Sequence, residues 1–290
     1  MSIGNNLRGL RAIRMFDNWP ALVLGRLLDR RTGLKVYRKN GMEILIDHLG
    51  GDCNGTRACL TTNMYSRYLP FFDIRRPVRV LDLGANGGGF LLMLKLAGVE
   101  VARGVCVEMN PVIFQRLQYN MARNLGPGVT TVNAAVCSMP LDSEVLLKPS
   151  RGGTGEGLST QRADTGSPHI SVRTTTLTAL MDRYFGGEPV DLCKIDVEGA
   201  EYEIFGSSSD DSLRQIGFLL AEFHDAPRTP AVAARLQRLG FSEMATGANH
   251  KTSGTTEVRL FRGPRAAGAS APDRSGPERV EDADPAIEPG

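Results

Sequence analysis

The chain has 290 residues, of which 41% are hydrophobic, 23% charged and 6% aromatic. This is an ordinary globular composition, and it excludes collagen-like, coiled-coil and wholly disordered chains. The formal net charge of +2 conceals an asymmetry, because residues 1–40 carry a net +7 and residues 266–290 a net −4.

The sequence shows neither a membrane span nor a targeting segment. No apolar run approaches the roughly 18 residues that a membrane helix needs, and no apolar stretch is followed by a signal-cleavage site. The five cysteines include no C-x-x-C pair, so we expect small buried hydrophobic side chains and neither a zinc site nor a disulfide framework. A cytoplasmic protein is therefore expected.

Residues 1–75 are predicted to form an N-terminal cap of helices and a β-hairpin. Apolar side chains recur about every third residue at Leu7, Leu10, Ile13, Phe16 and Trp19. Such a stripe is typical of an amphipathic helix, and Asn40-Gly41 between two β-type runs predicts a hairpin. We expect the stripe to pack on the main domain at its substrate side. Peripheral membrane contact through residues 1–33 is the alternative.

Residues 76–265 are predicted to form one α/β domain. Strands are expected at 78–83, 104–108, 130–136, 190–196 and 216–223, helices at 90–96, 111–125, 177–184 and 231–239, and two closing strands at 241–244 and 257–261. This alternation predicts a mostly parallel sheet with helices on both faces and an antiparallel hairpin at its edge. Residues 266–290 contain no aromatic residue and are expected to be a disordered tail.

A glycine-rich loop, Asp82 to Gly89, follows the first strand and opens a helix. It lacks the lysine of a phosphate-cradling G-x-x-x-x-G-K-[ST] loop, and Asn86 occupies the middle position of a G-x-G-x-x-G motif. An acid at Asp82 would repel a pyrophosphate and attract an amino group. The loop therefore favours a ligand with an ammonium end.

Glu108 ends the next strand, 24 residues after Gly84. An acid about 20 residues beyond such a loop is where both hydroxyls of a ribose are bound by one carboxylate. A solvated carboxylate at the strand end is the alternative. Because the loop and the acid occur together, we predict that Glu108 binds a ribose.

Two later strands also end in polar residues. Asp196 ends one of them, and Glu222 and His224 end the next. Ligands bind at the carboxyl ends of strands in open α/β sheets, so we expect these side chains to share one crevice. His224 has the pKa of a general base near neutrality. Glu198 and Glu201 are as consistent with the start of a helix, and a divalent metal at Asp196, Glu222 and His224 is an alternative that we do not predict.

At these residues the sequence resembles the FkbM family of S-adenosylmethionine-dependent methyltransferases. The resemblance covers roughly residues 51–262, and Tyr65 also lies where the family tends to have a tyrosine. Four motifs carry it in this order: Asp82-Leu83-Gly84-Ala85-Asn86-x-Gly88, Val107-Glu108-x-Asn110-Pro111, Asn133-Ala134-Ala135-Val136 and Leu192-x-Lys194-Ile195-Asp196-Val197-Glu198-Gly199-Ala200-Glu201.

The resemblance implies a class I methyltransferase fold, Rossmann-like, with a seven-stranded sheet in the order 3-2-1-4-5-7-6. It implies O-methylation of a small-molecule or glycan acceptor, with no nucleic acid. The methionine part of the cofactor would be held by Asp82, Gly84, Asn86 and Gly88. Its ribose would contact Glu108, its adenine Ala134 or Ala135, and its sulfonium would face Asp196.

The mechanism expected from these residues is an in-line displacement helped by alignment and by a general base. We predict His224 as that base, supported by Asp196 with Glu222 beside them. Two alternatives are a nicotinamide-dependent oxidoreductase, which Asp82 and Asn86 disfavour, and a non-catalytic cofactor-binding scaffold. The glycine-rich segment 149–169 is expected to be a lid. Neither the oligomeric state nor the acceptor is indicated.

Overall fold

The computed structural model describes residues 3–28, 33–72, 74, 76–147, 170–251, 254–266 and 277–280. The expected lid at 149–169 lies outside these ranges. Within them, every helix is too short or too polar to cross a bilayer.

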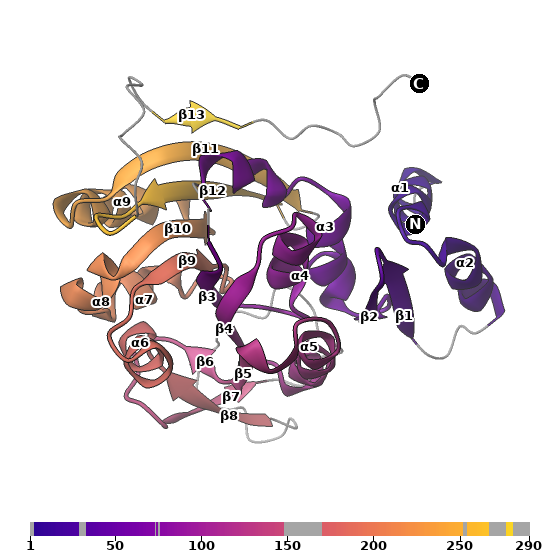
Figure 1. Cartoon of the computed structure of the whole chain (residues 1–290), viewed down its shortest axis with the longest axis horizontal. Coiled ribbons are helices and arrows are strands. Elements are labelled where there is room, and N and C mark those ends of the chain that lie inside the picture. The colour runs from indigo at the N-terminus through magenta and orange to yellow at the C-terminus, as the bar shows by residue number, and fades with distance from the viewer. Residues whose placement is uncertain are drawn as a thin grey trace.

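The centre of the molecule is a twisted, mostly parallel sheet (Figure 1). Its order is β13-β11-β12-β10-β9-β3-β4-β5, with parallel pairing from β10 to β5 and antiparallel pairing of β12 with β10 and β11. Apart from β13, this is the predicted order 3-2-1-4-5-7-6, which is confirmed. The strands are β3 (Val78–Leu83), β4 (Val101–Glu108), β5 (Val129–Asn133), β9 (Val190–Ile195), β10 (Ile216–Phe223), β11 (Ser242–Lys251), β12 (Gly254–Arg262) and β13 (Glu278–Arg279).

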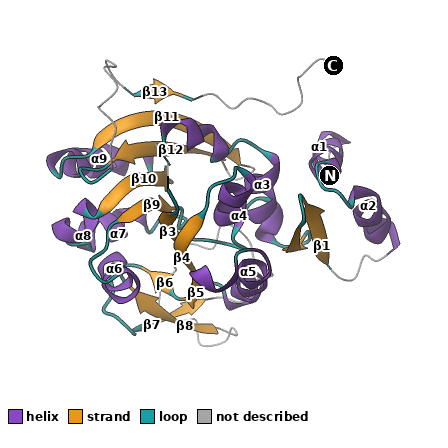
Figure 2. Ribbon diagram, viewed as in Figure 1, coloured by secondary structure: helices purple, strands orange, loops and turns teal. Residues whose placement is uncertain are grey.

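Helices cover both faces of the sheet, as predicted (Figure 2). One layer holds α3 (Thr56–Thr61), α4 (Gly89–Leu96) and α5 (Pro111–Asn124), and the other α6 (Leu177–Phe185), α7 (Glu201–Ser207), α8 (Asp210–Arg214) and α9 (Thr229–Arg238). The two layers pack on alternate side chains of β3, since Val80 joins one apolar core and Leu81 the other. Strands buried on both faces explain the continuous apolar runs in the sequence.

The N-terminal cap consists of α1 (Ile3–Arg14), α2 (Trp19–Leu28) and a hairpin of β1 (Leu34–Lys39) and β2 (Met42–Asp47). Asn40 and Gly41 both have positive φ, +47° and +78°, the backbone form that the predicted two-residue turn requires. Ile13 and Phe16 are only 1% exposed. The hairpin covers them, because the ring of Phe16 packs edge-on against Tyr37 at a centroid distance of 4.8 Å.

Two asparagines of α5 fasten the cap to the domain. Asn120 accepts from the backbone N of Leu45 at 2.7 Å and donates to its carbonyl at 3.1 Å. Asn124 makes the same pair of bonds with Glu43, at 3.0 and 2.9 Å. The two side chains therefore satisfy the edge of β2 as a neighbouring strand would. Asn120 also donates to the carbonyl of Gly87 at 2.8 Å, which ties the cap to the glycine-rich loop.

Three features differ from the sequence-based predictions. The strand expected at 130–136 is split at Ala134 into β5 and β6 (Ala135–Val136), because β6 pairs with β8 (Ile170–Thr175) in a small second sheet completed by β7 (Glu144–Leu147). The hydrophilic sequence around that sheet concealed its strands. In the tail that we expected to be disordered, Glu278–Arg279 pair with β11, so that prediction is wrong for β13. Short 3₁₀-helices lie at Gly51–Cys53, Ser66–Phe71, Gly126–Gly128 and Ala226–Arg228.

Candidate active site

A cavity of about 950 Å³, including open solvent at its mouth, lies at the carboxyl ends of β3, β4 and β9. Its wall is built by the glycine-rich loop, the residues that follow β4, β5 and β9, and the start of α3. Carboxyl strand ends are where open α/β sheets bind ligands.

The glycine-rich loop turns sharply under the cavity. Gly84 has φ +76°, and a Cβ there would lie 1.8 Å from the carbonyl oxygen of Asp196, so this position accepts only glycine. Asn86 also has positive φ, +51°, and its side-chain oxygen accepts from the hydroxyl of Thr56 at 2.9 Å. Gly84 and Asn86 line the cavity, whereas Gly88 is packed against Met121.

Glu108 lies on the cavity wall and is only 8% exposed. Its carboxylate accepts from the backbone N of Asn86 at 2.9 Å and from that of Asn110 at 2.8 Å. Burial raises the pKa of Glu108 to about 7, although the two backbone N–H groups act to lower it. Each carboxylate oxygen retains a further lone pair. The residue is thus placed where a diol could donate to it.

Asp82 is placed differently from our expectation. It is fully buried, and its carboxylate is paired with the Nζ of Lys194 at 3.1 Å. Of these two described residues, only Lys194 lines the cavity. The structure therefore contradicts the predicted direct contact between Asp82 and a ligand ammonium. Lys194 of β9 neutralises Asp82 beneath the loop instead.

The two alanines proposed for adenine are separated by the break between β5 and β6. Ala134 lies at the break and lines the cavity, together with Val136. Ala135 is 1% exposed and packs in the small core beneath the second sheet. Of the two alanines, only Ala134 therefore borders the cavity.

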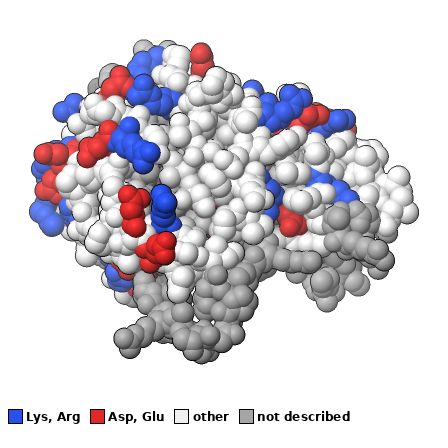
Figure 3. Space-filling view, turned by 90° about the horizontal axis from the view of Figure 1, so that it is seen from below, with Lys and Arg blue, Asp and Glu red and all other residues white. Residues whose placement is uncertain are grey.

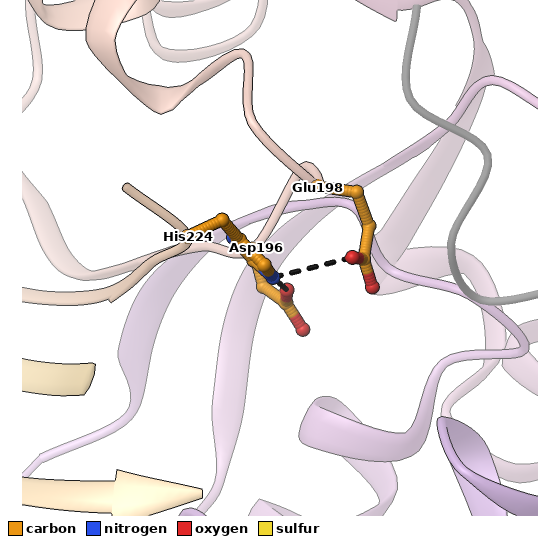
Figure 4. Close-up of side chains that lie close together, drawn as sticks. All are labelled: Asp196, Glu198 and His224. Atoms are coloured by element: carbon orange, nitrogen blue, oxygen red, sulfur yellow. Dashed lines mark ion pairs between the residues drawn. The ribbon is translucent and has the colours of Figure 1, made fainter. Parts of the chain in front are cut away.

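A cluster of acids surrounds His224 at the other end of the cavity, and Figure 4 shows two of them, Asp196 and Glu198. Its Nδ1 lies 2.8 Å from Glu201, and its Nε2 lies 3.2 Å from Glu198, 3.8 Å from Glu222 and 3.9 Å from Asp196. Burial alone would lower the pKa of His224, but the Glu198 and Glu201 carboxylates raise it to about 10. Asp196, Glu198 and His224 are also close enough together to hold a metal ion.

Tyr65 links the two predicted carboxylates. Its hydroxyl lies 2.8 Å from Asp196 and 3.0 Å from Glu222, within hydrogen-bond distance of both. Glu222 also accepts from the side-chain nitrogen of Asn249 at 3.0 Å. The three predicted residues Asp196, Glu222 and His224 are thus brought together, although only Asp196 of the three lines the cavity among the described residues.

The structure also shows what the sequence reasoning missed. The sequence is as consistent with Glu198 at the start of a helix as with Glu198 in the site. In the structure Glu198 has a φ of +52°, precedes α7 and faces His224. Strained non-glycine backbone of this kind concentrates at functional sites. For Tyr65, the family resemblance was the only indication in the sequence, because its hydrogen-bond partners Asp196 and Glu222 lie 131 and 157 positions away.

The cap predicted over residues 1–75 meets the cavity through part of its length. Residues between Asn54 and Tyr65 line the cavity, whereas no described residue of α1, α2 or the hairpin does. Ile13 and Phe16 of the apolar stripe belong to the same buried core as α3, α4 and α5, with Phe16 packed on Tyr37 of the hairpin. On the face seen in Figure 3, acidic and basic side chains are interspersed.

A family profile described as "Methyltransferase FkbM domain" matches residues 82–243, more than half of the chain. This range contains both ends of the cavity described above. A search of the curated proteins finds no match to the sequence.

Similar solved structures include several methyltransferases. The tRNA m1G37 methyltransferase of M. jannaschii is 10% identical, with a TM-score of 0.46 over 80% of this chain and 57% of that one. A candidate tRNA (m1A22) methyltransferase of Streptococcus pneumoniae in complex with S-adenosyl-L-methionine is 13% identical, with a TM-score of 0.43 over 69% and 72%. The precorrin-6y C5,15-methyltransferase of Geobacter metallireducens is 14% identical, with a TM-score of 0.39 over 68% and 86%.

Proposed function

The chain belongs to the FkbM methyltransferase family and is an S-adenosylmethionine-dependent methyltransferase, and from this premise we propose that it methylates a hydroxyl oxygen of a small-molecule or glycan acceptor. One observation carries the proposal. A single cavity is lined by Glu108, suited to a ribose, and by Asp196, suited to a hydroxyl proton. Such a pairing is what a cofactor and an alcohol acceptor need side by side.

The cofactor end of the cavity fits S-adenosylmethionine. Glu108 would accept from the ribose hydroxyls, Ala134 would contact the adenine, and Gly84 with Asn86 would hold the methionine part. The absence of a Cβ at Gly84 lets the backbone turn beneath such a ligand. When bound, S-adenosylmethionine supplies an electrophilic methyl group on its sulfonium.

The acceptor end depends on Asp196. This carboxylate lines the cavity and is held by the hydroxyl of Tyr65 at 2.8 Å. His224 is less suited to act on an acceptor directly, because Glu201 and Glu198 face its two nitrogens and it lies behind the wall. We therefore move the predicted general-base role from His224 to the Asp196 end, where the acceptor hydroxyl is oriented and loses its proton. Tyr65, Glu222 and His224 act as positioning residues.

The cap carries a separate proposal. Its helices expose Trp19, Leu24 and Leu28, which are 38%, 55% and 78% accessible, and Arg11 and Arg14 end α1. Apolar area combined with basic side chains is what peripheral membrane contact requires. Residues 1–33 would then bring the enzyme to an anionic surface. Cosedimentation of the full chain and of a chain lacking residues 1–33 with anionic vesicles tests this, and equal binding of both refutes it.

Calorimetry with S-adenosylhomocysteine and with NAD tests the cofactor part of the proposal. We expect binding of S-adenosylhomocysteine alone, and binding of NAD alone would support an oxidoreductase instead. Turnover is then measured as S-adenosylhomocysteine release with polyhydroxylated acceptors and with amine acceptors. Release with amines only would contradict O-methylation, and binding without any turnover would favour the scaffold.

A further inference from the structure

We propose that Asp196, Glu198 and His224 form a binding site for one divalent metal ion, which methyl transfer does not by itself require. The three residues come from the end of β9, the turn after it and the end of β10 (Figure 4). One ligand atom of each lies within 4.8 Å of the others. Two carboxylate oxygens and one imidazole nitrogen form a donor set that suits Mn²⁺ and related divalent ions.

The orientation of His224 supports this site. Its Nδ1 is held 2.8 Å from the Oε1 of Glu201, which is fully buried and accepts in turn from the backbone N of Gly199 at 3.1 Å. A carboxylate on the far nitrogen of a metal-binding histidine normally fixes its tautomer and direction. The arrangement thereby aims Nε2 into the space between Asp196 and Glu198.

The Nε2 atom itself is the second observation. It is buried, and it lies 3.2 Å from Oε2 of Glu198, 3.8 Å from Oε1 of Glu222 and 3.9 Å from Oδ1 of Asp196, so three carboxylates converge on one nitrogen. A metal ion bound to Nε2 satisfies the nitrogen and accounts for the carboxylates that converge on it.

The local charge agrees with a bound cation. Four carboxylates face the imidazole, and the Nζ of Lys194 lies 3.1 Å from Asp82 and 3.9 Å from Asp196. A divalent cation placed among these carboxylates would be attracted by each of them.

The position of the site suggests what the ion does, and this part rests on the proposed function. Asp196 and Glu198 both line the cavity, so the ion would be reachable from it. Three protein ligands leave coordination positions open. An acceptor with two neighbouring hydroxyls, as in a sugar, could fill them. Asp196 would then hold the ion that binds the acceptor oxygen.

The test is a titration of the full, metal-stripped chain with Mn²⁺, in which electron paramagnetic resonance measures the concentration of free Mn²⁺. We expect one site per chain, with Mn²⁺ affinity lowered at least about tenfold by Glu198→Gln and by His224→Gln. The matched control is Glu203→Gln, which removes the same charge from an exposed position on α7 and should leave Mn²⁺ affinity unchanged. Circular dichroism establishes that each variant is folded.

S-adenosylhomocysteine binding to the same samples separates the two proposals. Cofactor binding without a Mn²⁺ site overturns the metal site alone. A Mn²⁺ site without cofactor binding overturns the proposed function and leaves the metal site standing. Equal Mn²⁺ affinity in wild type, Glu198→Gln and His224→Gln shows that the ion binds elsewhere and also overturns the inference.

Discussion

The two ends of the cavity are built in different ways. At the cofactor end, Glu108 is held by backbone N–H groups of Asn86 and Asn110, at most 22 positions away in the chain. At the acidic end, Asp196 is held by Tyr65, 131 positions away. Backbone donors hold one carboxylate in place, whereas side chains from distant segments surround several acids. Since we propose that the first end binds the cofactor and the second orients the acceptor, we expect substitutions at the first end to alter cofactor affinity and substitutions at the second to alter kcat.

Asp196→Asn should give the largest effect. It removes the carboxylate that faces the acceptor, so we expect kcat to fall about 10²–10⁴-fold, the usual contribution of acid–base assistance. S-adenosylhomocysteine affinity should stay within about twofold, because the cofactor end is intact. Steady-state kinetics and calorimetry measure both, with exposed Asp182→Asn as the control. A variant that loses affinity and keeps kcat would reverse the comparison.

Asn120→Ala should destabilise the contact between the cap and the glycine-rich loop at the cofactor end. The variant removes the hydrogen bonds that Asn120 makes with the backbone N and carbonyl of Leu45 and with the carbonyl of Gly87. Unpaired buried groups of this kind should lower the free energy of unfolding by about 3 kcal/mol. Urea denaturation measures it, and Gln118→Ala, exposed on the same helix, should cost almost nothing. Equal stability of the two variants would show that the asparagine pairing is not needed.

Glu108→Ala should weaken S-adenosylhomocysteine binding by about 1–3 kcal/mol, since two hydroxyls lose a charged acceptor. The fold should persist, because the carboxylate lies at a strand end. Calorimetry measures the affinity, and Glu100→Ala, an exposed acid before β4, serves as the control. Unchanged affinity in the Glu108 variant would remove the ribose assignment.

The pH dependence of cofactor binding should sharpen the same assignment. Burial raises the pKa of Glu108 to about 7, so the free protein holds a proton there at lower pH. If the ribose prefers the carboxylate, S-adenosylhomocysteine affinity should fall about tenfold from pH 8 to pH 6. Glu108→Gln should flatten the profile over this range. A wild-type affinity that rises toward pH 6 would mean that the protonated form is the one that binds.

Local patterns predicted most of the fold. The strand at Ile216–Phe223 and the turn at Asn40-Gly41 were predicted correctly, since burial on both faces and positive φ leave direct marks in a short stretch. The break at Ala134 and the small second sheet were not predicted. They depend on pairing between β6 and β8, which are far apart in the sequence.

The sequence by itself determined the alternation of strands and helices, the glycine-rich loop and the position of Glu108, because these depend on periodicity and on spacings within one βαβ unit. The order of the strands was implied only by the resemblance to the FkbM family. Only the tertiary structure decided that Lys194 neutralises Asp82, that Tyr65 reaches Asp196 and that Glu201 orients His224. Charges on neighbouring strands change one another's role once they are buried within a few ångströms. Such proximity is set by packing across the sheet, and no local pattern records it.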